Sequence, residues 1–430
     1  MTVTRPAPDP GVPADPAPSA PGVLRRLRAE LTARRTLWVT VPLLAISLFW
    51  SAIRLGGYAL DLDIYRIGVQ VWMAGGDMYG TLPEPMNGPV LPFIYPVFAA
   101  AAMVPLALVP YGVAFWIQFV VSVLSLTGCI AIAVRVAWPA GGWAGAGIVT
   151  VPALALTLLL EPVAQTMAFG QINLLLMLLV LADCLLPRTR WPRGLLLGLA
   201  AAIKLTPGGF VLFLLVRRDW RAVGVAVATG IVATGLGFVV DPDSSYRYWF
   251  VRGPAAGVSG STFFSNETVQ AILARQEVAE PWFTVLWLVV VAVLLAMAIP
   301  VIRRSEPVLA LSATAAVVLM ATPTAWSHHW VWVIPALCAI GVHAARHRSW
   351  VWAALGAVIA TVFYLAPFRW MPNVWGVEMK WNLGDQILGA SYVIPATVAL
   401  ALGCWYVTRG PGRPGGPHAP DELALRVGQG

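Results

Sequence analysis

Long apolar runs recur along almost the whole chain, and they constrain its fold more than any other feature. One of them, residues 283–302, contains no charged side chain. Only 11% of the chain is charged, whereas soluble domains carry about 25%. A helix of about 20 apolar residues crosses the hydrocarbon core of a bilayer with its backbone hydrogen bonds satisfied internally. The sequence therefore predicts an all-α polytopic membrane protein.

Basic residues are concentrated at the ends of these runs. The formal net charge is +8, which in a soluble protein would point to nucleic acid as a partner. Here, however, the arginines fall in short loops, as is typical of loops that stay in the cytoplasm. Arginines also precede the first run, residues 37–53, and so place the N-terminus inside. We therefore expect membrane lipid, and no nucleic acid, as a partner.

The sequence divides into one membrane domain and two polar tails. No cleavable signal peptide is expected, because residues 1–22 are rich in Pro and Ala and lack an apolar core. The four cysteines lie inside apolar runs without metal-ligand spacing. We therefore expect neither disulfides nor a metal site from them. The predicted parts are a disordered basic cytoplasmic tail (1–36), a membrane domain (37–408) with outer loops at 56–92, 241–281 and 367–389, and a disordered cytoplasmic tail (409–430).

Matching the runs to the basic loops predicts about twelve transmembrane helical elements with both termini inside. Residues 93–110 contain three prolines and are interpreted as re-entrant or interfacial. Residues 194–216 are too short for two ordinary spans, so they predict two half-length helices with an apex at 204–207. In the long first outer loop, residues 64–73 predict an interfacial helix with one apolar face.

This topology places the unusual polar residues on one side of the membrane. Ionisable groups within a polytopic bundle are costly, and they generally mark functional sites. We therefore expect an active site on the outer side. The residues brought to that side are Asp61, Asp63, Arg66, Glu161, Gln171, Lys204, Asp241, Asn266, His328 and His329.

Asp61 and Asp63 follow the first span in a predicted loop. In isolation such carboxylates are ordinary solvated charges. Beside Tyr58, Tyr65 and Arg66 at a membrane exit, however, one of them can act as a general base that deprotonates a sugar hydroxyl. The Asp-x-Asp spacing also fits a divalent cation, but two carboxylates alone are weak evidence for one. The spacing does not choose between the two aspartates.

Lys204 lies deep between two basic loops. A cation at the bilayer centre costs roughly 2.5–3.5 kcal/mol on insertion scales, so it generally faces a cavity or a partner. Lys204 is therefore interpreted either as a snorkelling side chain or as the cation for a lipid-carried phosphate.

Gln171 and Asn173 can form hydrogen bonds between helices or provide a polar lining. On one continuous helix they would lie about 200° apart and could not share a face.

His328 and His329 lie at an outer span end, between tryptophans that fit an aromatic belt. Neighbouring residues on a helix point in different directions, so the two imidazoles are not expected to share a metal. One of them can instead donate a hydrogen bond to a phosphate or to an acceptor. The sequence does not say which.

Together these segments resemble a known family. The motifs are 61–66 (Asp-Leu-Asp-Ile-Tyr-Arg), 170–173 (Gly-Gln-Ile-Asn), 204–207 (Lys-Leu-Thr-Pro) and 326–329 (Trp-Ser-His-His). In this order they resemble the actinobacterial polyprenol-phosphate-mannose-dependent α-(1→2)-mannosyltransferases, glycosyltransferase family 87 of the GT-C superfamily, and among these the enzymes of higher phosphatidylinositol mannosides. The sequence departs from the family pattern at 95–97, 266–268 and 322–325.

The resemblance implies a GT-C fold and an inverting transfer, without a metal or other cofactor, by a monomer in the plasma membrane. The implied donor is polyprenyl-phosphate-mannose, the acceptor is a mannosylated glycolipid, and the site faces the periplasm. The family pattern assigns the catalytic base to Asp61, with Asp63 as the alternative. We then expect Asp63 to have a supporting role in which it orients Arg66. The implied contacts to donor phosphate and substrate are Arg66, Lys204, His328, His329, Asp63, Tyr65, Gln171, Asn173 and Asn266.

Two other functions remain open from the sequence. One is a GT-C transferase with another lipid-linked sugar or acceptor, such as an enzyme that branches lipomannan or lipoarabinomannan. The other is a lipid or sugar transporter of the same topology. A transporter predicts two symmetric halves with paired broken helices, whereas only the segment around Lys204 has the pattern of a broken helix.

Overall fold

A computed structural model describes residues 20–54, 56–253, 261–372 and 376–409, and these residues are almost entirely helical. Residues 1–19 and 410–430 of the predicted tails lie outside the described residues. Seven helical stretches of the described part are long and apolar enough to span a membrane, or as many as nine if each of two bent pairs counts as one span. The all-α polytopic fold predicted from the sequence is therefore confirmed.

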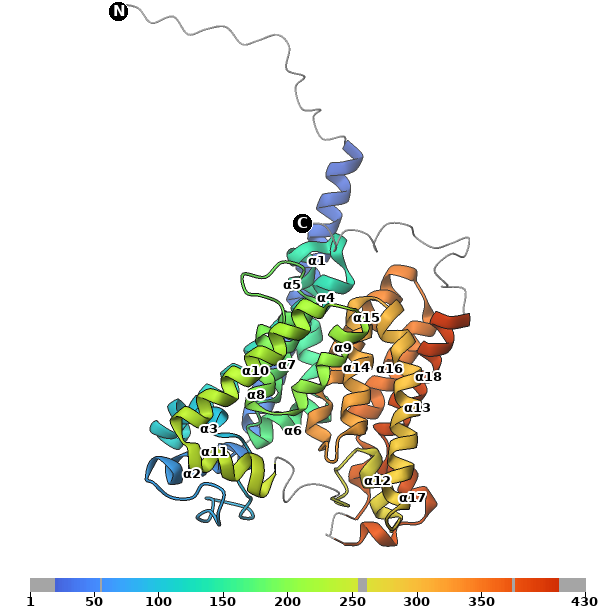
Figure 1. Cartoon of the computed structure of the whole chain (residues 1–430). Helices are drawn as coiled ribbons and strands as arrows, with labels where there is room; N and C mark the ends of the chain where they lie inside the picture. Colours follow the sequence, from blue (N-terminus) through green and yellow to red (C-terminus); the bar gives the residue numbers. More distant parts are fainter. Residues whose placement is uncertain (1–19, 55, 254–260, 373–375, 410–430) are drawn as a thin grey trace, which may run out of the picture.

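The long helices form the bundle (Figure 1). Helix α13 covers the predicted run at 283–302, whereas α1 starts at Ala20, inside the predicted tail. Residues 23–35 of that tail are rich in Leu, Arg and Ala, which are strong helix formers. The long helices are α1 (Ala20–Arg54), α4 (Tyr111–Ala137), α5 (Gly142–Thr157), α7 (Asn173–Leu185), α10 (Trp220–Val240), α13 (Trp282–Arg304), α14 (Pro307–Ala321), α15 (Val333–His347), α16 (Trp350–Leu365) and α18 (Val393–Arg409).

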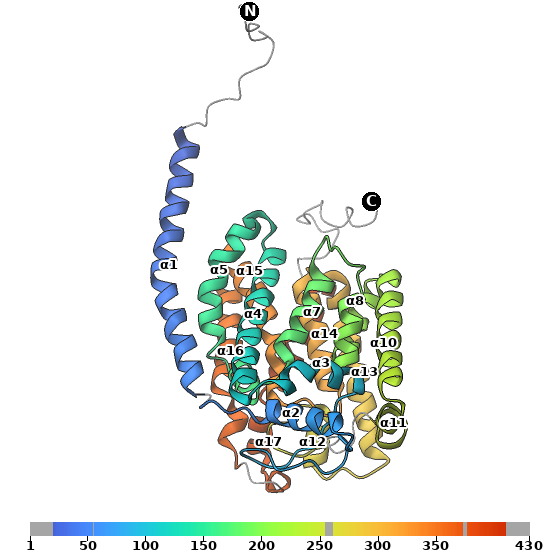
Figure 2. The ribbon, with the colours of Figure 1, turned by 90° about the vertical axis from the view of Figure 1, so that its left-hand side faces the viewer.

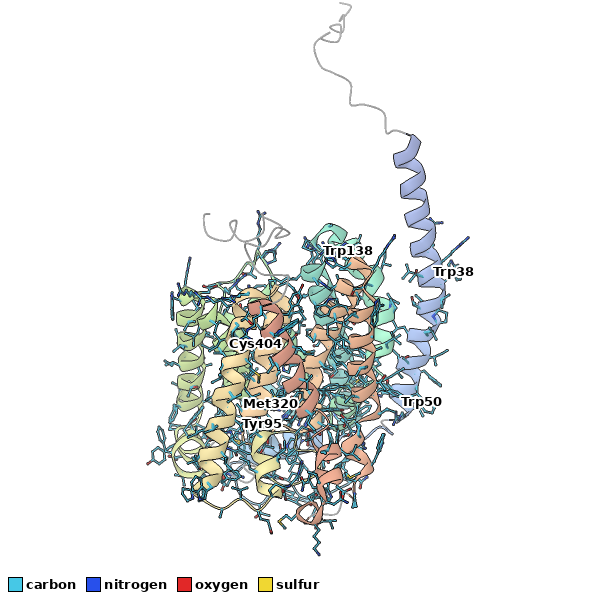
Figure 3. The ribbon with its side chains drawn as sticks, turned by 90° about the vertical axis from the view of Figure 1, so that its right-hand side faces the viewer. Trp38, Trp50, Tyr95, Trp138, Met320 and Cys404 are labelled. Atoms are coloured by element: carbon cyan, nitrogen blue, oxygen red, sulfur yellow. The ribbon has the colours of Figure 1, made fainter. Side chains whose placement is uncertain are left out.

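The first helix stands at the side of the bundle (Figure 2), where it packs mainly on α5. Trp38 and Trp50 point away from the other helices (Figure 3) and are 80% and 54% exposed. Large apolar side chains with that exposure are suited to hydrocarbon, not to water. The exposure of α1 is therefore what a lipid-facing helix requires.

Shorter helices gather at one end of the bundle, which we call the cap: α2 (Leu60–Met73), α3 (Val97–Leu108), α11 (Pro242–Tyr246), α12 (Val269–Arg275) and α17 (Leu383–Gly389) (Figures 1 and 2). With 12 residues, α3 is too short to span a membrane, in agreement with its predicted re-entrant or interfacial character. The remaining short helices are α6 (Glu161–Phe169), α8 (Leu195–Ile203) and α9 (Val211–Val216).

The segment around Lys204 has the predicted broken form. Helix α8 ends at Ile203, Lys204 is extended, and the 3₁₀ turn Thr206–Phe210 leads into α9. Pro207 lies at the start of that turn, where its missing N–H leaves no helical hydrogen bond unmade. Lys204 is therefore an extended residue between two helical segments, and its side chain reaches the interior of the bundle.

Helix α2 differs from its predicted form in two respects. It begins at Leu60, so Asp61 lies in the first helical turn and not in a loop. The predicted single apolar face is wrong as well, because the five consecutive residues Leu62 to Arg66 are all buried. Helices α3 and α6 both pack against α2. As a result, both faces of this short helix are covered.

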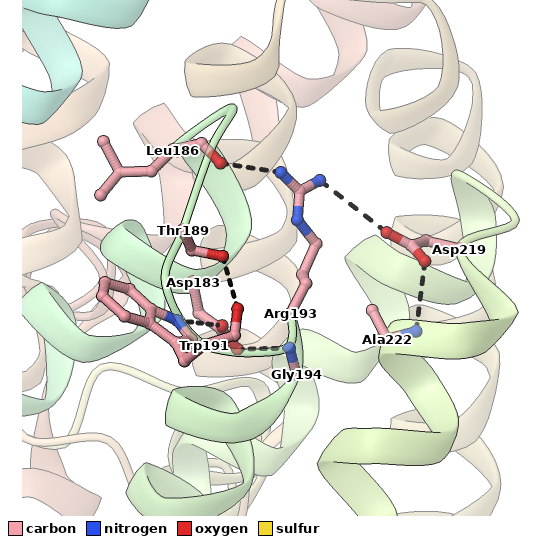
Figure 4. Close-up of polar contacts among 8 residues, drawn as sticks. All are labelled: Asp183, Leu186, Thr189, Trp191, Arg193, Gly194, Asp219 and Ala222. Carbon is pink, nitrogen blue, oxygen red and sulfur yellow. Dashed lines mark hydrogen bonds and ion pairs between the residues drawn. The ribbon is translucent and has the colours of Figure 1, made fainter. Parts of the chain in front are cut away.

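The opposite end of the bundle is fastened by a buried aspartate (Figure 4). Asp183 accepts hydrogen bonds from the indole of Trp191 at 3.0 Å and from the backbone N–H of Gly194 at 2.8 Å. Arg193 extends the contact to Asp219, which caps the start of α10. This buried acid therefore accepts hydrogen bonds from the loop before α8 and from the first turn of α8. It lies at the end of the bundle away from the cap.

Candidate functional site

The site is built around a break between two helices. The chain bends by 118° between α6 and α7. Gly170 ends α6 in the left-handed region, with φ of 67°. A Cβ at Gly170 would lie only 2.8 Å from Cβ of Leu62 and 3.0 Å from Cβ of Ala59. Glycine therefore provides both the turn and the close approach. The break presses directly on the first turn of α2, which carries Asp61.

Asp61 is bound by the residue that follows this glycine. The Gln171 amide donates a hydrogen bond to Oδ2 of Asp61, and its carbonyl accepts one from the Tyr65 hydroxyl at 2.7 Å. Burial raises the pKa of the Asp61 carboxyl to about 6, while Gln171 and the Lys204 ammonium lower it. A carboxylate with a pKa near neutrality is well matched to general base catalysis.

Lys204 approaches the same glutamine from the other side. Its Nζ lies 3.4 Å from Oε1 of Gln171, 3.0 Å from Oδ1 of Asn173 and 3.1 Å from Nε2 of His329. These three acceptors match the three protons of an ammonium group. Gln171 and Asn173 thus share a face after all, contrary to the sequence argument, because α7 begins only at Asn173 and Gln171 lies in the break.

The two histidines lie in a 3₁₀ segment, Ser327–Trp332. Their ring centroids are 4.7 Å apart and the ring planes are nearly perpendicular. His329 faces Lys204, whereas His328 packs against Phe169. Among the described residues, neither Nε2 of His328 nor Nδ1 of His329 has a hydrogen-bond partner, although both atoms are buried. These two nitrogens are available to a bound ligand.

Asp63 and Arg66 lie on the other side of α2. Asp63 accepts hydrogen bonds from the Met86 backbone at 2.8 Å and from the Tyr58 hydroxyl at 3.4 Å, so it anchors the first outer loop. The expectation that it orients Arg66 is wrong: no ion pair joins them in the described part of the chain. The two aspartates also bind different partners, so the Asp-x-Asp pair does not converge on one point.

Arg66 caps α3. Its guanidinium donates to the carbonyl oxygens of Leu106 and, at 2.7 Å, of Val109. Gln70, one turn further along α2, donates to the carbonyl of Ala107 at 3.0 Å. The last carbonyls of a helix need such partners, and a cation there is favoured by the helix dipole. The structure therefore gives Arg66 a stabilising role away from the cluster of Asp61 and Lys204.

Asn266 is fully buried and also supports the backbone. Its side chain donates to the Ser261 carbonyl at 2.7 Å and accepts from the Ala325 N–H at 3.0 Å. It pairs with Trp326 in an isolated bridge, the only one among the described residues. Asn266 thus holds the segment that leads into the histidine pair, and it does not join the cluster itself.

Glu161 has a larger part in the structure than the sequence indicated. Its buried carboxylate accepts hydrogen bonds from Ser327 and from Tyr392, both at 2.8 Å, and contacts Arg369 at 3.4 Å. Ser327 directly precedes the histidine pair, so Glu161 helps to fix that segment. Tyr392 and Arg369 carry no motif, and only the three-dimensional fold brings them here.

The described residues contain no group of three or more His, Cys, Asp or Glu side chains placed to hold a metal ion. The cluster that does form consists of Asp61, Tyr65, Gln171, Lys204 and His329, with Asn173 beside them. It combines a carboxylate, a cation and an imidazole at the cap end of a polytopic bundle. Such a set can remove a proton from one group and stabilise negative charge on another. These are the requirements of a membrane transferase that acts on an anionic donor.

Comparison with known proteins identifies the class. The family model of glycosyltransferase family 87 matches residues 93–323. A relative from Mycobacterium tuberculosis is 36% identical over 87% of this chain and 92% of its own. A relative from Mycolicibacterium smegmatis is 33% identical over 96% of each chain. The chain therefore belongs to glycosyltransferase family 87, and it is a membrane glycosyltransferase.

Both relatives bear the same name, polyprenol-phosphate-mannose-dependent alpha-(1-2)-phosphatidylinositol mannoside mannosyltransferase. Among solved structures, the chain is similar to ArnT from Cupriavidus metallidurans bound to undecaprenyl phosphate. That similarity has a TM-score of 0.42 and 17% identity, over 86% of this chain and 77% of the other.

Proposed function

We propose that this protein transfers mannose from polyprenyl-phosphate-mannose to a phosphatidylinositol mannoside in α-(1→2) linkage, acting as a monomer with inversion at the anomeric carbon. The names of the relatives support this donor and this class of acceptor. The observation that carries the proposal is that Gln171 binds both Asp61 and Lys204. The base and the cation therefore lie on either side of one side chain.

In the proposed reaction, Asp61 takes the proton from the 2-hydroxyl of the acceptor mannose. The hydroxyl oxygen attacks the anomeric carbon of the donor, and the bond from that carbon to the phosphate oxygen breaks. The electron pair leaves with the polyprenyl phosphate, whose negative charge grows in the transition state. Lys204 and the neighbouring imidazoles stabilise that charge. No further cofactor is needed for this balance of atoms and charge.

His329 contributes a directed hydrogen bond in this scheme. Its Nε2 accepts from the Lys204 ammonium at 3.1 Å, so a neutral ring carries its proton on Nδ1. That nitrogen has no partner among the described residues. A phosphate oxygen is a suitable acceptor for it, because hydrogen bonds to charged groups are stronger than those between neutral groups.

An apolar groove beside Lys204 supports a lipid-linked donor. The groove has a volume of about 530 Å³ and lies between α8 and α10, with the aromatic rings of Phe238, Trp249 and Phe250 among its walls. Leu205, the residue next to Lys204, also lines it. A polyprenyl chain in this groove would keep its hydrocarbon in apolar surroundings. Its phosphate would then lie near the segment that carries Lys204, which itself lines a smaller neighbouring cavity with Asn173 and His329.

The placement of the site toward the periplasm rests on the distribution of charge. Arg188, Arg190, Arg193 and Arg217 lie in loops at the end of the bundle away from the cap. Basic loops remain in the cytoplasm. This distribution supports a cap, and with it Asp61, on the periplasmic face of the plasma membrane.

The proposal is tested with purified protein in lipid nanodiscs, supplied with polyprenyl-phosphate-mannose and a series of phosphatidylinositol mannosides. We expect products heavier by one hexose, whose linkage is read by α-mannosidase digestion and methylation analysis. Transfer from arabinose- or glucose-bearing carriers, with none from the mannose donor, would reject the proposed sugar. In liposomes, movement of an unmodified lipid across the bilayer without product would instead indicate a transporter.

A further inference from the structure

Both ends of the Gln171 amide are engaged inside the protein. Oε1 accepts from the Tyr65 hydroxyl at 2.7 Å and faces Lys204 at 3.4 Å, while Nε2 donates to Asp61. The residue is only 6% exposed. With its oxygen facing two partners and one of its two N–H groups bound to Asp61, the side chain has at most one N–H left. It is therefore poorly suited to bind a sugar or a phosphate, which is the role that the family resemblance assigned to it.

The backbone of Gln171 is held as firmly as its side chain. Its N–H donates to the Thr166 carbonyl at 2.9 Å, and its carbonyl accepts from Nε2 of Gln118 on α4 at 3.0 Å. The left-handed turn at Gly170 fixes the direction in which the chain enters the break. Position 171 is therefore anchored to α6 and α4 independently of its side-chain contacts.

Its neighbours also determine which way round the amide lies. Lys204 can only donate, so the oxygen of the amide must face it. The Asp61 carboxylate can only accept when ionised, so the nitrogen must face Asp61. A flipped amide would set its NH₂ group against the ammonium and its oxygen against the carboxylate. Two unfavourable contacts would replace two favourable ones.

We propose that Gln171 is a positioning residue, which orients the carboxylate of Asp61 and separates it from Lys204. A direct ion pair between the two would hold the carboxylate against the lysine and weaken it as a base. The inserted amide keeps Asp61 bound by a neutral donor and leaves the ammonium to the leaving phosphate. This inference rests on the proposed function, because it takes Asp61 as the base.

The titratable groups that face Asp61 come from several segments: Tyr58 before α2, Tyr65 on α2, Tyr95 before α3 and Lys204 after α8. Burial raises the pKa of Asp61, whereas the hydrogen bond from Gln171 and the charge of Lys204 lower it. Loss of the amide donor must therefore raise this pKa further. It leaves the tyrosines in place.

The test compares Gln171→Met and Gln171→Glu with the unmodified enzyme, by following kcat/KM for the donor against pH. We expect the acid limb of the profile to move up by about one pH unit in Gln171→Met, because a hydrogen bond to a charged group is lost. In Gln171→Glu the shift is larger, since two adjacent carboxylates cannot both ionise readily. Gln70→Met, which loses only the hydrogen bond to the carbonyl of Ala107 away from the cluster, serves as the control and keeps the original limb.

A raised KM for the donor with an unmoved acid limb in both Gln171 variants would overturn the proposal and make Gln171 a substrate ligand. Lower thermal stability with an unmoved limb would likewise overturn it and leave a structural role only. Melting temperatures in detergent are therefore measured for all three variants.

A second measurement needs no turnover. Carbodiimide couples an amine to protonated carboxyl groups, so the extent of labelling at Asp61 against pH, read by mass spectrometry, gives its titration midpoint. A higher midpoint in Gln171→Met supports the positioning role even if the unmodified protein transfers no mannose, in which case only the proposed function fails. An unchanged midpoint overturns the positioning role even in an active enzyme.

Discussion

Nζ of Lys204 lies 3.1 Å from Nε2 of His329, although 125 residues separate them in the sequence. Lys204 comes from the apex of a broken helical segment and His329 from a 3₁₀ turn, so neither lies on a regular helix. The contact gives the imidazole a fixed orientation and adds a third polar group beside the cation.

Replacement of His329 by Ala should lower kcat by about 10²-fold, the usual cost of removing one donor to a developing negative charge. The KM for the acceptor should change little, because in the proposed reaction the imidazole contacts the leaving phosphate and not the acceptor. His343→Ala, at the far end of α15, is the matched control and should retain activity. Steady-state kinetics of mannose transfer compares the two variants. Equal losses of kcat in His329→Ala and His343→Ala would count against a contact between His329 and the phosphate.

Asp61→Asn should reduce transfer by about 10²–10⁴-fold, because the amide cannot accept the hydroxyl proton. Asp63→Asn supplies a close control, since Asp63 is two residues away on the same helix and anchors the Met86 backbone. It should lower thermal stability modestly and leave kcat nearly unchanged. Full activity in Asp61→Asn, measured by product mass in nanodiscs, would exclude Asp61 as the base.

The activity should depend on pH through Asp61. Its pKa is raised to about 6, and the base works only when it is deprotonated. Below about pH 6, kcat/KM should therefore fall tenfold for each unit of pH, and above it the profile should level off. A profile that stays flat down to pH 4 would contradict a base of this pKa.

Lys204→Met should abolish the stabilisation of the phosphate while the fold is kept, because Met fills a similar volume. We expect kcat to fall by at least 10²-fold, together with weaker binding of the polyprenyl phosphate product as an inhibitor. Lys380→Met, at an exposed lysine of the cap end, is the control. Equal inhibition of Lys204→Met and unmodified enzyme by polyprenyl phosphate would argue against a phosphate contact.

Gly170→Ala should destabilise the site, since the residue has φ of 67° and its new Cβ would meet Leu62. A non-glycine residue forced into such a position costs about 1–3 kcal/mol. Gly224→Ala is the matched control, because a Cβ there has nothing within 4 Å. Thermal unfolding in detergent should show a lower midpoint for the first variant only, accompanied by a loss of activity.

The sequence predicted the spans, the broken segment at Lys204 and the divergent histidines, because apolar length, basic loops and helical geometry act locally. It wrongly predicted that Gln171 and Asn173 face different directions, because that prediction assumed one continuous helix. In the structure the helix is interrupted between α6 and α7, and Gln171 lies in the interruption. Only the structure shows that Arg66 and Asp63 serve the backbone of the cap. Both are polar residues on a membrane protein, and their type alone does not separate capping from substrate contact.

The partners of Glu161 illustrate the remaining limit in physical terms. Tyr392 lies 231 residues further along the chain, yet its hydroxyl is 2.8 Å from the Glu161 carboxylate. Which distant residues form hydrogen bonds to a buried acid depends on how the helices pack. Neither Glu161 nor Tyr392 lies in a recognisable motif, so their pairing could not be predicted from the sequence.

The apolar groove beside Lys204 has a consequence for the kinetics. In the proposed reaction, the carrier lipid enters along α8 and α10, beside Leu205 of the segment that carries the lysine, and does not leave the bilayer. Encounter is then a two-dimensional process, and the supply of donor depends on its mole fraction among the surrounding lipids, not on its bulk concentration. Diluting the donor with inert lipid at constant total donor should slow the enzyme, whereas diluting the vesicles in buffer should not.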